Sequence, residues 1–379
     1  MPYWRLSSFY LFYFGALGAL VPFWGLYLQD RGLSAAAIGS LMAILMGTKV
    51  VAPNLWGWIA DHTGQRMPIV RLASVLSVVA FASIFWAQGF WGIATVMLVF
   101  SFFWNASLPQ MEAVTFNHLG ARVNRYALVR VWGSVGFIIT VGLMGLQVDW
   151  LGTASIPSTV LALYIGIWIS SLLVPDKGHG AQADDAPSLW GLLRQPEIAF
   201  FLIACMLMQM SHGVYYAFYS IYLEAAGYRH ATVGALWAFG VVIEVLVFIR
   251  MHRLLERFGA RRVLIASLGL ATVRWSLIGL FVDRPAIQLL AQAMHAATFG
   301  SFHAAAIHLT HHYFTGRTQG RGQAIYSSLS FGAGGGVGAL LAGWLWEPLG
   351  GAGTFVLASL IAALGTLTAW GFVDRARRW

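Results

Sequence analysis

The chain has 379 residues, of which 59% are apolar and only 10% are charged. Soluble domains have roughly 25% charged residues, so this composition excludes a water-soluble globular protein. The net charge of +9 does not indicate nucleic-acid binding, because the basic residues fall in short clusters between apolar stretches. The single Cys205 lies in an apolar run, which excludes a disulfide framework and a cysteine metal site.

Apolar runs of about 18 residues or more predict an all-α polytopic membrane protein. The first run follows Arg5 and has no small-residue cleavage site, so we expect a membrane span and not a removed signal peptide. Twelve spans are expected, over residues 6–28, 35–59, 69–88, 91–118, 127–148, 152–174, 196–223, 231–251, 262–281, 286–312, 322–346 and 351–373.

The polar stretch 175–195 divides six spans from six, which predicts an N-terminal six-helix bundle over 1–174 and a C-terminal bundle over 196–379. Basic residues near span ends are retained on the cytoplasmic side. With the N-terminus inside, seventeen basic residues lie inside and three lie outside. We therefore expect a bacterial inner-membrane protein with both termini and the central loop 175–195 in the cytoplasm.

An internal repeat relates the two halves. Residues 26–43 match residues 221–238 at an offset of 195, and residues 57–66 match 252–261 at the same offset. Because six spans lie in each half, this is a parallel repeat about an axis along the membrane normal. The predicted architecture is two pseudo-symmetric six-helix bundles facing each other across a central cavity.

Five charged residues fall inside the predicted spans. A charge at the centre of a span costs about 2.5–3.5 kcal/mol, so such residues usually face a cavity and have a partner. They are Lys49, Glu112, Arg130, Glu244 and Arg274.

Glu112 and Arg130 each lie nine residues from Ala121, near the centre of one cytoplasmic connection. Both therefore lie about 13 Å along antiparallel helices and can meet. The pair is either a buried strut between helices or a substrate site, with Arg130 recognising a carboxylate or hydroxyl group. Trp132 follows closely and is a candidate for stacking on a substrate.

Glu244, Arg274 and His295 converge on one mid-membrane layer by the same depth argument, and His303 lies two helical turns after His295. Glu244, Arg274 and His295 predict a site for proton coupling or substrate binding, with a structural charge network as the alternative. His303 is included with them as a candidate for proton coupling. Lys49 is the repeat counterpart of Glu244. It is either a second anion ligand, which could bridge to Glu244 in one conformation, or a lysine that reaches a membrane face.

We expect no metal site and no cofactor. His308, His311 and His312 lie near the end of a span beside Arg317, which is typical of an interfacial polar face. A glycine-rich run at 332–343 lacks the Lys-Ser/Thr of a phosphate loop and indicates close helix packing.

The segment GWIADHTGQR at 57–66 resembles the G-x-x-x-D-x-x-G-x-R/K loop signature of the major facilitator superfamily. With twelve spans and a degenerate second copy of this loop, the resemblance covers the whole chain. It implies a conformational latch built from Gly57, Asp61, Gly64 and Arg66, which stabilises the outward-facing state.

A narrower resemblance joins the chain to the oligosaccharide:proton symporters and, more closely over helices eight to ten, to the 3-phenylpropionic acid transporters. It is carried by PQMEA at Glu112, YALVRVWGSVGF at Arg130, TVRWSLIG at Arg274 and MHAATFGSFHAAA from Met294. The resemblance implies that Glu112 and Arg130 engage substrate. The chain departs from the oligosaccharide symporters at Thr298, where that group has a proton-carrying Glu.

The sequence thus predicts a secondary transporter, not an enzyme, that imports a small organic anion with protons by alternating access, with an aromatic monocarboxylate such as 3-phenylpropionate first. Arg130 would bind the carboxylate and Glu244 would carry the proton, with the proton gradient as the only energy source. Proton symport of a neutral sugar or nucleoside is the alternative, followed by drug/proton efflux and a membrane sensor. The expected partners are a small-molecule substrate, protons and the lipid bilayer, without nucleic acid, and the working form is a monomer.

Overall fold

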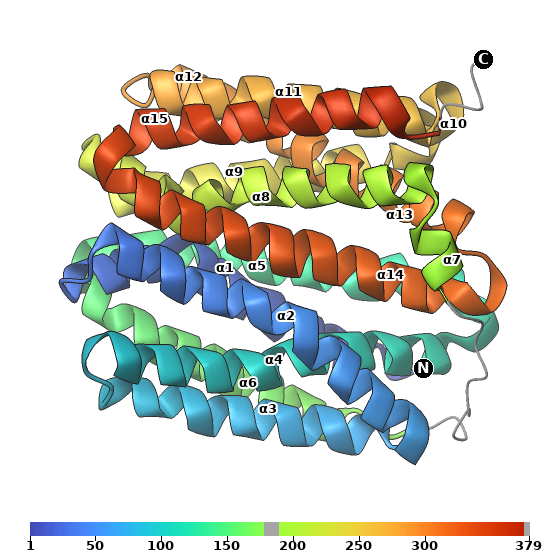
Figure 1. The fold of residues 1–379 in the computed structure, drawn as a ribbon. Helices are drawn as coiled ribbons and strands as arrows, with labels where there is room; N and C mark the ends of the chain where they lie inside the picture. Colours follow the sequence, from blue (N-terminus) through green and yellow to red (C-terminus); the bar gives the residue numbers. More distant parts are fainter. Residues whose placement is uncertain (178–188, 375–379) are drawn as a thin grey trace. The chain divides into compact units, whose positions relative to one another are not determined.

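The computed structural model describes residues 1–177 and 189–374, which form helices and no strands (Figure 1). Most of the predicted loop 175–195 and the last arginines of the chain lie outside the described residues. The first half contains α1 (Tyr3–Asp30), α2 (Ala35–Thr63), α3 (Arg66–Ala82), α4 (Gly89–Leu119), α5 (Tyr126–Leu151) and α6 (Ile156–Leu173). Three 3₁₀ turns join them, η1 (Ser83–Phe85), η2 (Gly120–Arg125) and η3 (Thr153–Ser155).

The second half begins with the short α7 (Trp190–Leu193) and contains two π-helical segments. Its elements are α8 (Pro196–Ala225), α9 (His230–Phe248), α10 (Met251–Phe258), α11 (Ala260–Leu280), α12 (Pro285–Ala293), η4 (Ala296–Ser301, π), α13 (Phe302–Tyr313), η5 (Gly316–Thr318), α14 (Gln319–Ser327), η6 (Ser328–Gly334, π) and α15 (Gly335–Phe372).

Ten helical segments of the described chain are long and apolar enough to cross a membrane. The last of them, Gln319–Phe372, is interrupted at Gly350, whose φ of 66° and ψ of 173° are not helical, so this segment makes two crossings. The run from α12 through η4 to α13 supplies another, because the π turn only divides a helix that continues over Pro285–Tyr313. The twelve predicted spans are confirmed with shifts of a few residues at their ends.

The chain divides into two compact units. Unit 1 contains Met1–Asp184 and Tyr228–Ala238, and unit 2 contains Asp185–Gly227 and Phe239–Trp379. The start of α9 belongs to unit 1 because it packs on α5. A Cβ on Gly145 of α5 would lie 2.4 Å from the carbonyl oxygen of His230, so only glycine allows this close approach. The division into bundles 1–174 and 196–379 stays a prediction.

The internal repeat extends to the backbone of the turns. Gly32 and Gly227 have φ angles of 75° and 85°, and Gly64 and Gly259 have φ angles of 67° and 78°. These left-handed conformations favour glycine because a Cβ would crowd the backbone. Repeat-equivalent glycines therefore end equivalent helices in the two halves.

In each half, an arginine side chain caps the C-terminal end of the last helix. Arg71 of α3 donates a hydrogen bond to the carbonyl oxygen of Val174 at 2.9 Å, just after α6. Arg261 of α11 donates one to the carbonyl oxygen of Val373 at 2.6 Å, just after α15. The carbonyl groups at a helix end have no partner within the helix, and these arginines satisfy them.

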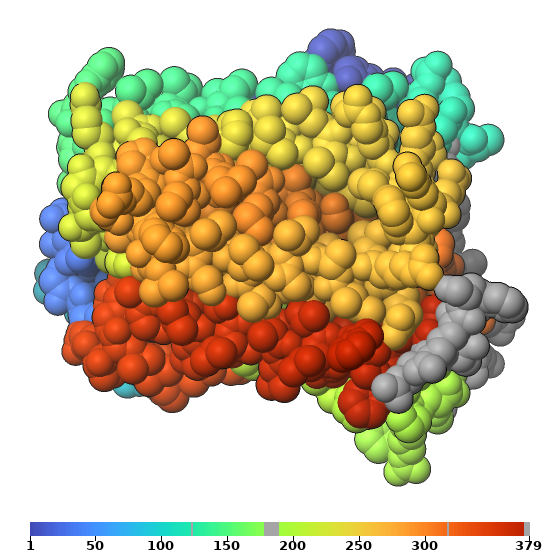
Figure 2. All heavy atoms as spheres, turned by 90° about the horizontal axis from the view of Figure 1, so that it is seen from above, coloured from blue at the N-terminus to red at the C-terminus, as the bar shows by residue number. Residues whose placement is uncertain are grey.

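Unit 2 is held together by close contact between α8 and α15. A Cβ on Gly338 would lie 2.0 Å from the carbonyl oxygen of Met210, so the two helix backbones touch at this point. Figure 2 shows α12 and the second half of α15 on one face of the unit. Their exposed side chains include Leu289, Leu290, Leu360, Leu364 and Leu367, which is typical of a surface covered by lipid.

Candidate functional site

The predicted meeting of Glu112 and Arg130 is confirmed. In unit 1, Arg130 Nε of α5 lies 4.0 Å from Glu112 Oε1 of α4. Tyr126, one helical turn before Arg130, donates a hydrogen bond to the same carboxylate oxygen at 3.2 Å. The side chains of Glu112 and Arg130 remain 34% and 31% exposed, so this ion pair is only partly buried.

Aromatic rings and a glycine shape the space around Arg130. The guanidinium carbon lies 3.8 Å from the centre of the Phe14 ring and 5.8 Å from that of Tyr10. A Cβ on Gly133 would lie 2.7 Å from Arg130 Nη1, so this glycine leaves room for the guanidinium group. The ring faces attract the cation and help to hold its plane.

Lys49 has no carboxylate partner among the described residues. Its ammonium group lies 3.6 Å from Met46 Sδ, one turn earlier on α2. The preceding residue, Thr48, donates a hydrogen bond to Ser101 Oγ at 2.9 Å and accepts one from the Asn105 side chain at 2.9 Å. These neighbouring polar groups therefore bond to one another. Lys49 is thus a cation within a span that no fixed negative charge of the described chain compensates.

The structure does not bring Trp132 to the ion pair of Glu112 and Arg130. Its indole N–H donates a hydrogen bond to the Tyr3 hydroxyl oxygen at 2.8 Å, and its ring lies edge-on to Trp4 with centres 5.3 Å apart. The physical reason is the helical rotation of about 200° between positions 130 and 132, which points the two side chains in different directions.

In unit 2, Glu244 of α9 pairs with His295, which lies just before η4. Glu244 Oε2 is 3.1 Å from His295 Nε2, and the two side chains are 15% and 8% exposed. The imidazole stacks on Phe299, with ring centres 5.3 Å apart and planes within 8°. Gly300 makes this approach possible, since a Cβ there would lie 2.9 Å from Glu244 Cγ.

Arg274 is fully buried and is held by neutral groups. It donates hydrogen bonds to the carbonyl oxygen of Ala291 at 2.9 Å, to Thr298 Oγ1 at 2.9 Å and to Gln292 Oε1 at 3.4 Å. Its guanidinium carbon also lies 4.5 Å from the centre of the Tyr215 ring. The ion pairs of the described residues join Glu244 to His295 and give Arg274 no carboxylate partner.

The other histidines of unit 2 extend the polar region. His303 Nδ1 lies 3.1 Å from the Tyr326 hydroxyl, and its ring lies 5.6 Å from that of Phe331. Phe331 also lies 6.2 Å from Phe299, the ring on which His295 stacks. His212 is completely buried against Trp275, with ring centres 4.7 Å apart, and its Nε2 atom has no hydrogen-bond partner among the described residues.

The predicted latch residues lie together in unit 1. Arg66 Nη2 pairs with the carboxylate of Asp61, and Arg66 Nη1 donates a hydrogen bond to Gln110 Oε1 of α4 at 2.7 Å. Gly64 ends α2, and a Cβ on Gly57 would lie 3.6 Å from Gln110 Nε2. The loop between α2 and α3 is therefore attached to α4 through one arginine.

Sequence reasoning missed several partners of the charged residues. Tyr126 is four residues before Arg130, and Gln292 and Thr298 lie three residues either side of His295, so helical spacing alone could have found them. Phe14 and Gln110 carry no such signal, because they come from helices far away in the sequence.

The chain is similar in sequence to known membrane transporters. The family model described as "MFS_1 like family" matches residues 3–357. The "Probable 3-phenylpropionic acid transporter" of Escherichia coli (strain K12) is 32% identical over 376 residues, covering 94% of each chain. The "Maltose permease" of Geobacillus stearothermophilus is 26% identical, covering 97% of this chain and 94% of the permease.

Solved structures show the same fold. The nucleoside transporter NupG, in a mutant form, superposes with a TM-score of 0.87 at 17% identity, covering 98% of this chain and 99% of that chain. The D-xylose-proton symporter superposes with a TM-score of 0.76 at 13% identity, covering 98% of this chain and 97% of the symporter.

Proposed function

The chain belongs to the MFS_1 like family and is a secondary transporter of the major facilitator superfamily, and on that premise we propose that it imports a small aromatic monocarboxylate together with protons. The observation that carries the proposal is the balance of charge inside the spans of unit 1. Two cations, Lys49 and Arg130, stand against one carboxylate, Glu112, so a ligand with one negative charge completes the set.

Arg130 is the proposed ligand of the substrate carboxylate. Its contact with Glu112 is long, at 4.0 Å, and both side chains are partly exposed. A substrate carboxylate can take the free edge of the guanidinium group in two parallel hydrogen bonds, while Phe14 holds the group in place. The printed name of the E. coli relative supports a phenyl-bearing acid as the first substrate to test.

Glu244 and His295 are the proposed proton-coupling pair. A carboxylate 3.1 Å from an imidazole can hold a proton between them or release it when the surroundings change. Arg274 lies close by and is held by neutral partners, the carbonyl oxygen of Ala291 and the hydroxyl of Thr298. The latch of Asp61 and Arg66 would then stabilise one conformation of the alternating cycle.

The test is uptake of labelled 3-phenylpropionate into proteoliposomes with and without an imposed proton gradient. We expect an inward gradient to drive accumulation, and Glu244→Gln to abolish accumulation while leaving substrate counterflow. Uptake indifferent to the gradient would overturn coupling. Full gradient-driven accumulation by Glu244→Gln would overturn the assignment of Glu244 alone.

Proton symport of a neutral sugar or nucleoside is the second candidate. It is favoured by the carboxylates of Glu112 and Glu244, because each already has a partner, Arg130 and His295, and can accept a hydrogen bond from a hydroxyl group. Competition separates the candidates. The uncharged 3-phenylpropanamide should compete poorly if the substrate is an anion, whereas maltose or a nucleoside should compete if it is neutral.

A further inference from the structure

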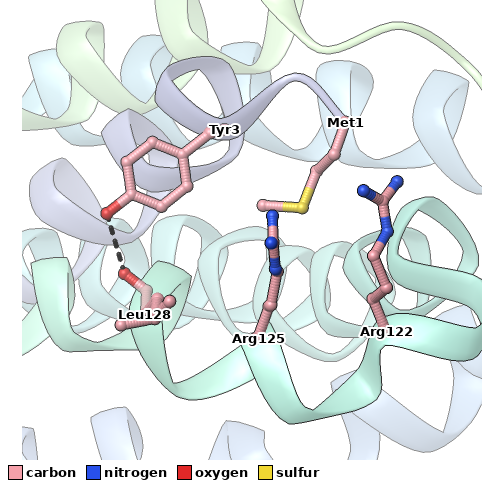
Figure 3. A pocket seen from close by; sticks show the side chains of 5 residues that line it. All are labelled: Met1, Tyr3, Arg122, Arg125 and Leu128. Carbon is pink, nitrogen blue, oxygen red and sulfur yellow. Dashed lines mark hydrogen bonds between the residues drawn. The ribbon is translucent and has the colours of Figure 1, made fainter.

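A pocket of about 440 Å³ opens in unit 1 beside the start of α1, away from the charged residues inside the spans. It is lined by Met1, Tyr3, Arg122, Arg125 and Leu128 (Figure 3). Arg122 and Arg125 belong to η2, the connection between α4 and α5. Figure 3 shows their side chains on the same side of the ribbon, directed toward the Met1 end of α1.

Both arginines are exposed, and the described part of the chain offers them no counter-charge. Among the described residues, no ion pair or hydrogen bond joins either guanidinium group to a carboxylate or to another partner. The backbone of Arg122 is non-helical, with φ −97° and ψ 40°, so the chain kinks at this residue. Two neighbouring cations without a fixed counter-charge form a site for an anion with several oxygen atoms.

The apolar side of the pocket is held by aromatic side chains. The Tyr3 hydroxyl donates a hydrogen bond to the carbonyl oxygen of Leu128 at 3.1 Å and accepts one from Trp132 at 2.8 Å. Trp4 packs edge-on against Trp132 and is 66% exposed. Tryptophan and tyrosine concentrate at the boundary between lipid and water, so we expect this pocket at the level of lipid headgroups.

We infer that this pocket binds the phosphate group of an anionic phospholipid, with Arg122 and Arg125 on the phosphate oxygens. The exposed ring of Trp4 and the side chain of Leu128, 59% exposed, would contact the upper part of the acyl chains. The arginine bias of the sequence predicts that this face is cytoplasmic, where anionic lipids attract basic residues beside a span. The inference also assigns a place to Trp132, which the substrate site does not use.

The experiment is native mass spectrometry of the full chain from nanodiscs of phosphatidylcholine with a minor fraction of phosphatidylglycerol. We expect the chain to retain phosphatidylglycerol, and Arg122→Gln with Arg125→Gln to reduce the retained fraction roughly tenfold. The matched control is Arg253→Gln with Arg257→Gln, which removes the same charge from exposed positions of α10. This control should retain the lipid.

An equal loss of retained phosphatidylglycerol in both double variants would overturn the proposed lipid site, because it would show only a general effect of net charge. Unchanged retention in the first variant would overturn it as well. Displacement of the lipid by inorganic phosphate or glycerol 3-phosphate at millimolar concentration would show that the source is a soluble phosphate and overturn the lipid assignment. If the double variant does not fold, the single variant Arg122→Gln, at an exposed position of a turn, replaces it. Its lipid retention is measured and interpreted in the same way.

Discussion

The carboxylate of Asp149 accepts a hydrogen bond from the backbone N–H of His230 at 3.0 Å, so a residue of α5 caps the first turn of α9. The second carboxylate oxygen accepts the N–H of Ala231 at 3.2 Å. Arg229 and the His230 ring lie 3.4 and 3.0 Å from the same group. The cap is therefore supplied by another helix and fixes the position of the start of α9 on α5.

Removing this cap should destabilise the protein. We expect Asp149→Ala to lower the free energy of unfolding by about 1–2 kcal/mol, because two N–H groups in a nearly buried site lose their acceptor. Asp149→Asn keeps an oxygen acceptor and should recover most of the loss. Thermal unfolding in detergent measures both, and Asp283→Ala, in an exposed pair with Arg284, should leave the midpoint unchanged. Equal shifts for the alanine and asparagine variants would contradict the cap.

The contact of α8 with α15 should tolerate no side chain at Gly338. A Cβ there would lie 2.0 Å from the Met210 carbonyl oxygen, so Gly338→Ala must push two helix backbones apart. We expect a loss of about 1–3 kcal/mol of stability, as for other overpacked sites. The control is Gly371→Ala on the same helix, where nothing lies within 4 Å and alanine is the better helix former. A thermal midpoint of Gly338→Ala equal to that of the unchanged protein would refute the contact.

Arg130 should not be replaceable by lysine. Lysine keeps the charge but loses the planar group that lies over Phe14 and the second hydrogen bond to a carboxylate. We expect Arg130→Lys to raise the KM for 3-phenylpropionate uptake about tenfold, and Arg130→Gln to reduce kcat/KM further. Arg284→Lys at the protein surface is the control. An unchanged KM in Arg130→Lys would remove this residue from the substrate site.

The latch should act on turnover and not on binding. Arg66 uses one nitrogen for Asp61 and another for Gln110, a geometry that lysine cannot reproduce. We expect Arg66→Lys to reduce the maximal uptake rate by about tenfold with little change in KM. Arg253→Lys on α10 serves as the control. A changed KM at an unchanged maximal rate would be the opposite of this expectation and would place Arg66 near the substrate.

Depth arithmetic along helices predicted which charged residues could meet, and it predicted the pair of Glu112 and Arg130 correctly. It works because rise per residue is fixed in a helix that crosses a membrane. It also placed Glu244 and Arg274 in one layer with His295, but it could not choose the partner of Glu244. That choice depends on helix rotation, and the π turn after His295 changes the rotation in a way that no residue spacing announces.

The direction in which a side chain points from its helix could not be predicted from the sequence either. Trp132 is two residues from Arg130, which suggested a shared site, yet it contacts Tyr3 and Trp4. Phe14 and Gln110 contact Arg130 and Arg66 from α1 and α4, and such contacts between distant segments become visible only when helices are packed. The spans and the repeat were readable because hydropathy and turn glycines are local properties.

The two π turns also record how the halves of the chain have diverged in length. Gly64 and Gly259 are separated by 195 residues, whereas Gly120 and Gly316, the corresponding left-handed glycines beyond η4, are separated by 196. Past η6 the separation between Gly152 and Gly350 is 198. A π turn accommodates one residue more than the α-helix around it, so η4 accounts for the one extra residue before Gly316, and η6 accounts for one of the two further residues before Gly350. The first of these extra residues lies beside His295, which gives the second half a local geometry that its duplicate does not share.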